Sequence, residues 1–121
     1  MSAPSQQIVL IVDDDESLLR TLARMLQRLG VKVQRATNGR EALELALQQQ
    51  FDIIITDMRM PRMSGFELIT SLTEKLETVP RIIVLSGYHD VAEAELRAAG
   101  VSTILSKPVS FDELRKHVLS D

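Results

Sequence analysis

Four carboxylates stand together near the start of the chain, directly after a strongly apolar segment. Residues 8–12 read IVLIV, and Asp13, Asp14, Asp15 and Glu16 follow without a break. Two carboxylates about 5 Å apart repel each other by roughly 3 kcal/mol at an effective dielectric constant of about 20. A divalent cation would turn this repulsion into attraction, and oxygen ligands without neighbouring His or Cys suit Mg²⁺. The alternative for the cluster taken alone is a solvated turn.

Three further polar side chains come directly after apolar segments: Asp57, Ser86 and Lys107. A carboxylate can act as a nucleophile toward phosphorus and form an aspartyl phosphate. Mg²⁺ and Lys107 could then neutralise the equatorial oxygens of the phosphoryl group, while Ser86 donates a hydrogen bond to one of them. Each residue alone could be an ordinary loop residue, but together they favour phosphoryl transfer.

The elements that must position these residues are five apolar segments, each followed by an amphipathic one. The predicted strands are residues 8–12, 31–36, 52–56, 81–85 and 103–106. The helices between and after them are predicted from their apolar spacing. The residues expected on their apolar faces are Leu18, Leu22, Met25, Leu26 and Leu29, then Ala42, Leu43, Ala46 and Leu47, then Phe66, Ile69, Leu72 and Leu76, and finally Phe111, Leu114 and Val118. An Ala-rich helix is expected at 91–99.

The ends of the helices carry recognisable signals. Gly30 and Gly100 are expected to end the first and fourth helices. Asn38 and Ser110 are expected to begin the second and the fifth.

Strands that are apolar on both faces and alternate with helices are typical of a parallel sheet covered on both sides. The predicted fold class is therefore α/β, a doubly wound parallel sheet. The segment 31–36 alternates polar with apolar residues, which predicts an edge strand. In such sheets function lies outside the carboxyl ends of the strands. Three acids, a hydroxyl and an ammonium group should therefore converge on that edge from four strands.

The composition limits the class of protein. The 121 residues suffice for one domain, 1–121, with residues 1–6 expected to be a flexible N-terminal segment. The net charge of −3 argues against direct nucleic-acid binding, and the absence of cysteine excludes disulfides and thiolate metal sites. The apolar segments are too short for a signal peptide or a membrane span. We expect a cytoplasmic domain that does not contact a membrane.

Four motifs resemble the receiver domain of two-component response regulators over essentially the whole chain. They are VDDDE after the first strand, TDMRMPRMSGFEL around Asp57, LSG at 85–87 and SKP at 106–108. The resemblance implies a flavodoxin-like sheet of five strands in the order 2-1-3-4-5 with five helices. It also implies a signalling switch rather than an enzyme with a separate substrate. Its phosphoryl donor would be a sensor histidine kinase or a histidine phosphotransfer protein, and its output an unidentified protein or linked domain.

The resemblance also assigns a role to each site residue. Asp57 is implied as the phosphoacceptor and as a ligand of Mg²⁺, or of Mn²⁺ in its place. Asp14 would be a direct metal ligand, Asp13 would hold a metal-bound water, and the backbone carbonyl of Arg59 would be a further ligand.

In the same reading, Ser86 fills the hydroxyl switch position and Lys107 pairs with the phosphoryl group. Pro61 and Gly65 match the loop after the acceptor, and Gly65 is expected to allow a backbone shape that a Cβ atom would forbid.

One position departs from the family pattern. Three residues before Lys107 the family often has Tyr or Phe, and here the residue is Ile104. An aliphatic side chain cannot swing a ring, so we hypothesise that Ser86 and the Tyr88-His89 loop carry the signal instead. The bulk of Arg59 and Tyr88 is expected to limit the access of water to the acyl phosphate. His89 and His117 lack metal partners at ligand spacing.

Three alternatives remain from the residues. A phosphatase of the haloacid-dehalogenase type would use Asp13 as its nucleophile, but it needs a second acidic pair where this chain has Ser-Lys-Pro. A flavodoxin-like FMN carrier would need a phosphate loop where the four carboxylates stand. A degenerate receiver that serves only in docking would keep the fold without the chemistry. The chain could equally be a single-domain regulator or the receiver of a longer protein.

Overall fold

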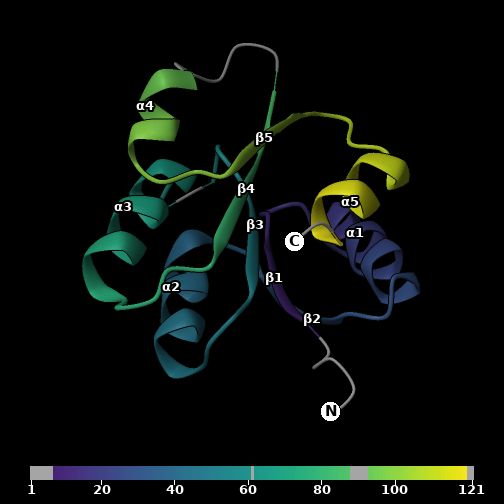
Figure 1. The fold of residues 1–121 in the computed structure, drawn as a ribbon, viewed down its shortest axis with the longest axis horizontal. Helices are drawn as coiled ribbons and strands as arrows, with labels where there is room; N and C mark the ends of the chain where they lie inside the picture. Colours follow the sequence, from purple (N-terminus) through teal and green to yellow (C-terminus); the bar gives the residue numbers. More distant parts are fainter. Residues whose placement is uncertain (1–6, 61, 88–92, 120–121) are drawn as a thin grey trace.

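The alternating pattern of the sequence forms a five-stranded parallel sheet (Figure 1). The computed structural model describes residues 7–60, 62–87 and 93–119. The strands are β1 (Ile8–Val12), β2 (Lys32–Ala36), β3 (Ile53–Asp57), β4 (Arg81–Ser86) and β5 (Thr103–Ser106). Their spatial order is β2-β1-β3-β4-β5, which confirms the predicted fold class and the edge position of β2.

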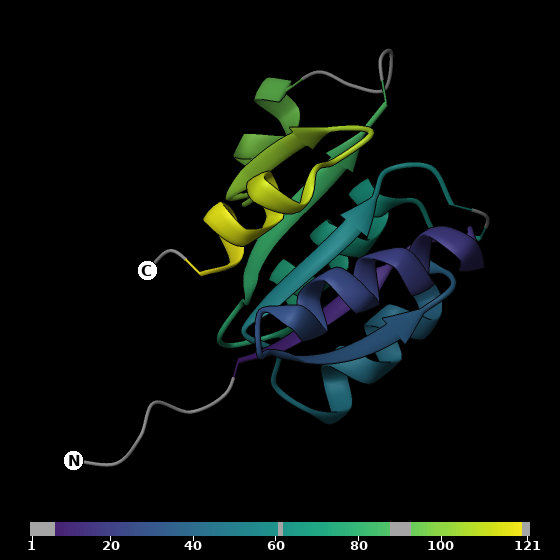
Figure 2. The same ribbon diagram turned by 90° about the vertical axis from the view of Figure 1, so that its right-hand side faces the viewer.

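Four helices connect the strands, a fifth follows the last strand, and together they cover both faces of the sheet. They are α1 (Glu16–Arg28), α2 (Gly39–Gln48), α3 (Gly65–Lys75), α4 (Glu93–Ala98) and α5 (Phe111–Val118). Helices α2, α3 and α4 lie on one face, and α1 and α5 lie on the other, which Figure 2 turns toward the viewer. None of the described helices is long and apolar enough to cross a bilayer.

The sheet divides the core into two apolar layers because successive side chains of a strand point to opposite faces. Leu10 and Val12 of β1 belong to the layer beneath α2, α3 and α4. Val9 and Ile11 belong to the layer beneath α1 and α5. All five residues of β3 are buried, which explains why the central strand carries no alternation in its sequence.

The predicted helix boundaries are confirmed where the signals were local. Asn38 caps α2 by accepting a hydrogen bond from the backbone N–H of Glu41, and Ser110 caps α5 in the same way. Gly30 and Gly100 follow α1 and α4 with φ of +84° and +109°, a left-handed conformation that glycine adopts without steric cost.

Two predicted apolar positions are wrong in orientation. Phe66 is 37% exposed and Leu47 is 51% exposed, whereas both were expected on an inward face. Successive helical residues are about 100° apart, so Leu47 lies a quarter turn from the buried Ala46. In α3 the buried arc is instead completed by Leu68, which was not predicted. The spacing of apolar residues locates the buried stripe of a helix, but it does not decide whether a residue at the margin of that stripe is buried or exposed.

A smaller shift of the same kind occurs in α1 and α5. Leu19 and Ala23 are buried in α1, whereas Leu18, Met25 and Leu29, which were predicted to be inward, are only half-buried at the margin. Phe111 is also half-buried, and the guanidinium carbon of Arg28 lies 4.8 Å from its ring centroid.

Candidate functional site

The register of the sheet places two of the predicted acids side by side. Val12 of β1 is paired with Thr56 of β3, so the next residues, Asp13 and Asp57, meet at the carboxyl end of these neighbouring strands. Both are buried, with 2% and 5% of their surface exposed. The close approach of two carboxylates thus follows from strand pairing alone.

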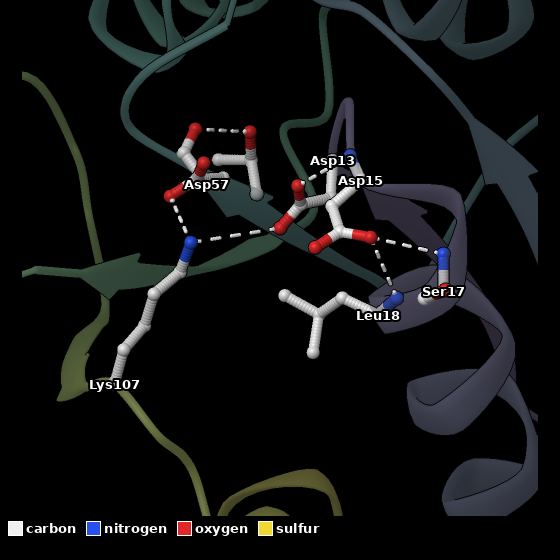
Figure 3. A network of polar contacts seen from close by, with 7 residues as sticks. Asp13, Asp15, Ser17, Leu18, Asp57 and Lys107 are labelled. Atoms are coloured by element: carbon white, nitrogen blue, oxygen red, sulfur yellow. Dashed lines mark hydrogen bonds and ion pairs between the residues drawn. The ribbon is translucent and has the colours of Figure 1, made fainter.

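Lys107 joins this acidic pair from the loop after β5 (Figure 3). Its Nζ atom lies 2.8 Å from Oδ1 of Asp57 and 3.7 Å from Oδ2 of Asp13. Its backbone N–H donates to the carbonyl of Ser86 at 3.0 Å, which ties the loop to the end of β4. Burial opposes the charge on Lys107, but the hydrogen bond to Asp57 and the charges of both acids outweigh it and raise the lysine pKa.

Asp13 is the electrostatically costly member of the site. Its Oδ1 accepts a hydrogen bond from the backbone N–H of Asp15 at 2.9 Å, whereas its buried Oδ2 has no hydrogen-bond partner among the described residues. Burial is the main cause that raises the pKa of Asp13, and repulsion from Asp57 and Asp14 adds to it. The Asp15 hydrogen bond and Lys107 act in the opposite direction but do not compensate.

The third carboxylate of the cluster is the exposed Asp14. Asp13, Asp14 and Asp57 each offer one ligand atom, and these atoms lie within 4.8 Å of one another. A set of carboxylate oxygens with one exposed member fits a hard cation such as Mg²⁺, which retains water ligands. The Oδ2 atom of Asp13 supports this fit, because it is buried, accepts no hydrogen bond among the described residues, and has only Lys107 Nζ at 3.7 Å to offset its desolvation.

Asp15, the remaining aspartate of the run, has a different task. Its side chain caps α1 by accepting hydrogen bonds from the backbone N–H groups of Ser17 at 3.0 Å and Leu18 at 3.2 Å (Figure 3). Sequence reasoning treated it only as part of the acidic cluster. The signal that could have separated it is its position directly before a helix, where Asp is a favoured first residue. It also anchors Asp13 through its own backbone N–H.

Ser86 and Arg59 lie at the same edge of the sheet but are less closely engaged. Ser86 ends β4 and is half-buried, and its Oγ donates to the carbonyl of Gly87 at 3.1 Å. No hydrogen bond among the described residues joins Ser86 Oγ to Asp57. Arg59 follows β3 by two residues and its side chain is exposed. Pro61 and the Tyr88-His89 pair lie outside the described residues.

Gly65 is required by space rather than by backbone conformation. A Cβ atom on this residue would lie 2.5 Å from the carbonyl oxygen of Asp57 and 3.0 Å from Cα of Met58. Its φ is not in the left-handed region. The prediction that glycine is needed here for an unusual backbone shape is therefore wrong. Glycine is needed because the backbone of Asp57 and Met58 approaches closely. Gly39 is a similar case that the sequence did not reveal, because its Cβ would lie 2.6 Å from the carbonyl oxygen of Met63.

Ile104 is half-buried on β5 and packs against the apolar layer beneath α2, α3 and α4. Its neighbour Leu105 belongs to the opposite layer. The position that departs from the family pattern therefore faces the same side of the sheet as α4.

Comparison with known proteins agrees with this geometry. A family model described as the response regulator receiver domain matches residues 9–119. The chain is 35% identical over 122 residues to the sensor protein EvgS of Escherichia coli K12, which covers 98% of this chain and 10% of that protein. It is 39% identical over 105 residues to a response regulator receiver protein of Anaeromyxobacter, covering 87% and 44%. The chain thus spans less than half the length of these two relatives.

Similar chains also occur among solved structures. The chemotaxis protein CheY4 of Vibrio cholerae superposes with a TM-score of 0.84 at 33% identity, covering 94% of this chain and 97% of that one. A response regulator receiver protein from Pseudomonas putida gives a TM-score of 0.85 at 34% identity, covering 96% and 98%. The similarity therefore extends over nearly the entire chain in both sequence and fold.

Proposed function

Because the chain belongs to the response regulator receiver family, whose members are signalling domains of two-component systems, we propose that Asp57 accepts a phosphoryl group and switches a protein-binding surface. The donor is a phosphohistidine on a sensor histidine kinase or on a histidine phosphotransfer protein. An unidentified downstream protein or linked output domain reads the switched surface. The protein acts in the cytoplasm and contacts neither membrane nor nucleic acid directly.

The observation that carries the proposal is the contact between Asp57 Oδ1 and Lys107 Nζ at 2.8 Å, beside Asp13 and Asp14. In the proposed step an oxygen of Asp57 attacks phosphorus, an O–P bond forms, and the N–P bond of the phosphohistidine breaks. The histidine nitrogen leaves with the bonding electrons and gains a proton. Lys107 then shifts from Asp57 to a phosphoryl oxygen, and Ser86 turns from Gly87 to donate to another.

The residues that would hold Mg²⁺ or Mn²⁺ are Asp14 and Asp57 directly, Asp13 through a water molecule, and Arg59 through its backbone carbonyl. The bound cation would neutralise negative charge on the transferring phosphoryl group. The buried Oδ2 of Asp13, which accepts no hydrogen bond among the described residues, and the spacing of the three carboxylates support this assignment.

The aspartyl phosphate is lost again by hydrolysis, which the domain assists without turning over a separate substrate. The exposed side chain of Arg59 stands two residues from the acceptor, where its bulk can limit the approach of water. If Arg59→Ala leaves the dephosphorylation rate unchanged, this role of Arg59 is excluded.

The test is intact-mass measurement after incubation with acetyl phosphate and Mg²⁺. The wild type should gain one phosphoryl group, about 80 Da, only when Mg²⁺ is present. Asp57→Ala should gain none, whereas Asp52→Ala, an exposed acid at the opposite end of β3, should behave like the wild type. A gain that survives Asp57→Ala but disappears in Asp13→Ala would instead support a nucleophile on β1, as in the phosphatase alternative.

A further inference from the structure

Many of the basic residues are concentrated in one segment of the chain, which the net charge of the whole chain does not show. Residues 17–40 contain six of the 14 Lys and Arg residues and none of the 17 acidic residues, which gives this segment a formal charge of +6. The other eight basic residues share the rest of the chain with all the acidic ones, which leaves −9 there. This segment forms α1, β2 and the start of α2, and the fold places α1 beside β2.

Three of these arginines line a groove between α1 and β2. Arg20 and Arg24 come from α1, one helical turn apart, and Arg35 comes from the edge strand β2. The groove has a volume of about 290 Å³, and Ala23 and Val33 contribute apolar surface to it. Helix α1 and strand β2 lie next to each other at this side of the molecule (Figure 2). We call this surface, formed by Arg20, Ala23, Arg24, Gln27, Val33 and Arg35, the α1–β2 arginine groove.

The three guanidinium groups are exposed and lack acidic partners. Within the described part of the chain, no carboxylate forms an ion pair with Arg20, Arg24 or Arg35. Arg20 has one weak contact, a hydrogen bond of 3.4 Å to Ser17 Oγ. Glu16 is the acid that lies near two of them, Arg20 and Arg35, in an adjoining depression, and it forms no ion pair with either among the described residues. The groove therefore presents several forked donors suited to carboxylates or phosphates.

The surroundings favour carboxylates on a protein over a long nucleic acid. Glu16 lines the depression that continues the groove toward the site, together with Arg20 and Arg35. The acids Asp13, Asp14 and Asp15 lie just beyond Glu16, and the remainder of the chain carries the negative charge. A uniformly charged polymer longer than the groove would run into this repulsion, whereas a short acidic segment would not. The apolar groups of Ala23 and Val33 can also receive aliphatic side chains.

We propose that the α1–β2 arginine groove is a docking surface for a short segment of a partner protein that combines Asp or Glu with aliphatic residues. The carboxylates contact Arg20, Arg24 and Arg35, and an aliphatic side chain covers Val33. Because none of the phosphoryl-transfer residues lines the groove, docking does not depend on Asp57. The groove supplies affinity and partner choice, while the chemistry takes place at the neighbouring strand ends.

The test uses a fluorescein-labelled peptide of alternating Glu-Glu-Leu units as the probe, with the full-length chain. Fluorescence anisotropy should show salt-sensitive binding, and amide shifts in an NMR titration should be confined to α1 and β2. The double variant Arg24→Gln/Arg35→Gln should weaken binding by about tenfold or more. The matched control Arg115→Gln/Lys116→Gln removes the same charge from the exposed face of α5 and should change binding less than about twofold.

Three outcomes would overturn the proposal. They are equal loss in the two double variants, amide shifts spread over the surface, or an oligonucleotide of equal charge that binds the groove as tightly as the peptide. Acetyl phosphate should phosphorylate the Arg24→Gln/Arg35→Gln variant at the same rate as the wild type. That result would show that the variant is folded. Asp57→Ala should bind the peptide like the wild type, so failure of the docking proposal can be told apart from failure of the phosphoryl-transfer proposal.

Discussion

The strand-end site and the α1–β2 arginine groove both concentrate charge, but they do so in opposite ways. At the site, Asp13 and Asp57 are buried, and strand register and a loop hydrogen bond hold the half-buried Lys107 with its Nζ atom 3.7 Å and 2.8 Å from their carboxylate oxygens. In the groove, like charges stand on exposed side chains that form no ion pair with an acid among the described residues. Burial and opposite charge give fixed geometry, whereas exposure and like charge give a field that acts at longer range.

This difference predicts where substitutions have large effects. Removing one member of a buried charged group leaves the others uncompensated, while removing an exposed charge is usually a small change. The site should therefore be sensitive to every substitution in both activity and stability, and the groove should be sensitive mainly in binding.

The largest effect is expected for Lys107→Met. Loss of the ammonium group next to Asp57 removes charge stabilisation for the transferring phosphoryl group, so the rate of phosphorylation by acetyl phosphate should fall by about 100-fold. Intact-mass time courses measure this rate, with Arg24→Met as a matched control for loss of a positive charge in the groove. A similar fall in both variants would mean that the two regions are not distinct in function.

The second effect compares the packing of the two regions through their glycines. Gly65→Ala should lower the free energy of unfolding by about 2 to 3 kcal/mol, because the new Cβ meets the Asp57 carbonyl oxygen at 2.5 Å. Gly30→Ala lies between α1 and β2, has no atom within 4 Å of its Cβ, and should cost only about 1 kcal/mol for its left-handed φ. Urea denaturation measures both values. Equal costs would refute the tighter packing at the site.

The third effect concerns the free-energy cost of the buried Asp13 carboxylate when no metal ion is bound. Asp13→Asn should raise the free energy of unfolding at neutral pH by about 1 kcal/mol in Mg²⁺-free buffer, because it removes a buried charge that faces another carboxylate. Added Mg²⁺ should stabilise the wild type more than the variant. If the variant is less stable than the wild type without Mg²⁺, the attraction of the Asp13 charge to Lys107 and to the backbone N–H of Asp15 outweighs the cost of burying that charge.

The pH dependence of this difference has a definite sign. The pKa of Asp13 is raised by burial in the folded protein, so this carboxyl group favours folding below its ordinary value of 3.8. The contribution is lost as the pH rises through the raised pKa. The free energy of unfolding of Asp13→Asn should therefore increase relative to that of the wild type from about pH 4 upward, and the difference should then level off. Denaturation curves at several pH values measure this difference.

The smallest effect is expected in the groove. The stability of Arg24→Gln/Arg35→Gln should stay within about 0.5 kcal/mol of the wild type, with any gain largest at low ionic strength because like charges are relieved. Thermal unfolding at two salt concentrations measures the difference. A strong loss of stability would show that these arginines stabilise the fold. They would then differ from the site residues less than the docking proposal requires.

The sequence predicted the fold and the convergence of site residues because both depend on local signals. The apolar strands, the alternation in β2 and the polar residue at each strand end are all legible in order along the chain. Asp15 as a helix cap and Gly39 against Met63 were missed, since the first was masked by its acidic neighbours and the second is a contact between distant segments. Net charge was also a poor guide, because the total of −3 conceals the charge of +6 on residues 17–40.

The errors in helix orientation have the same origin. Leu47 and Phe66 fit the apolar spacing of their helices, and only the packing of α2 and α3 on the sheet decides that these two stay exposed while Ala46, as predicted, and Leu68, which was not predicted, are buried. Apolar spacing alone does not fix the rotation of a helix about its axis to within one residue.

The hydrogen bond from the guanidinium of Arg81 to the carbonyl of His117 has a consequence for protein engineering. It holds the last turn of α5 beside the first residue of β4, at the edge of the sheet opposite Asp57. The start of β1 lies at that same edge (Figure 2). The described residues therefore begin, at Gln7, and end, at Leu119, on the side away from the acceptor, separated from it by the length of a strand, about 15 to 20 Å. A fluorescent protein or an affinity tag joined to the chain before Gln7 or after Leu119 should thus leave the acidic edge open to a donor.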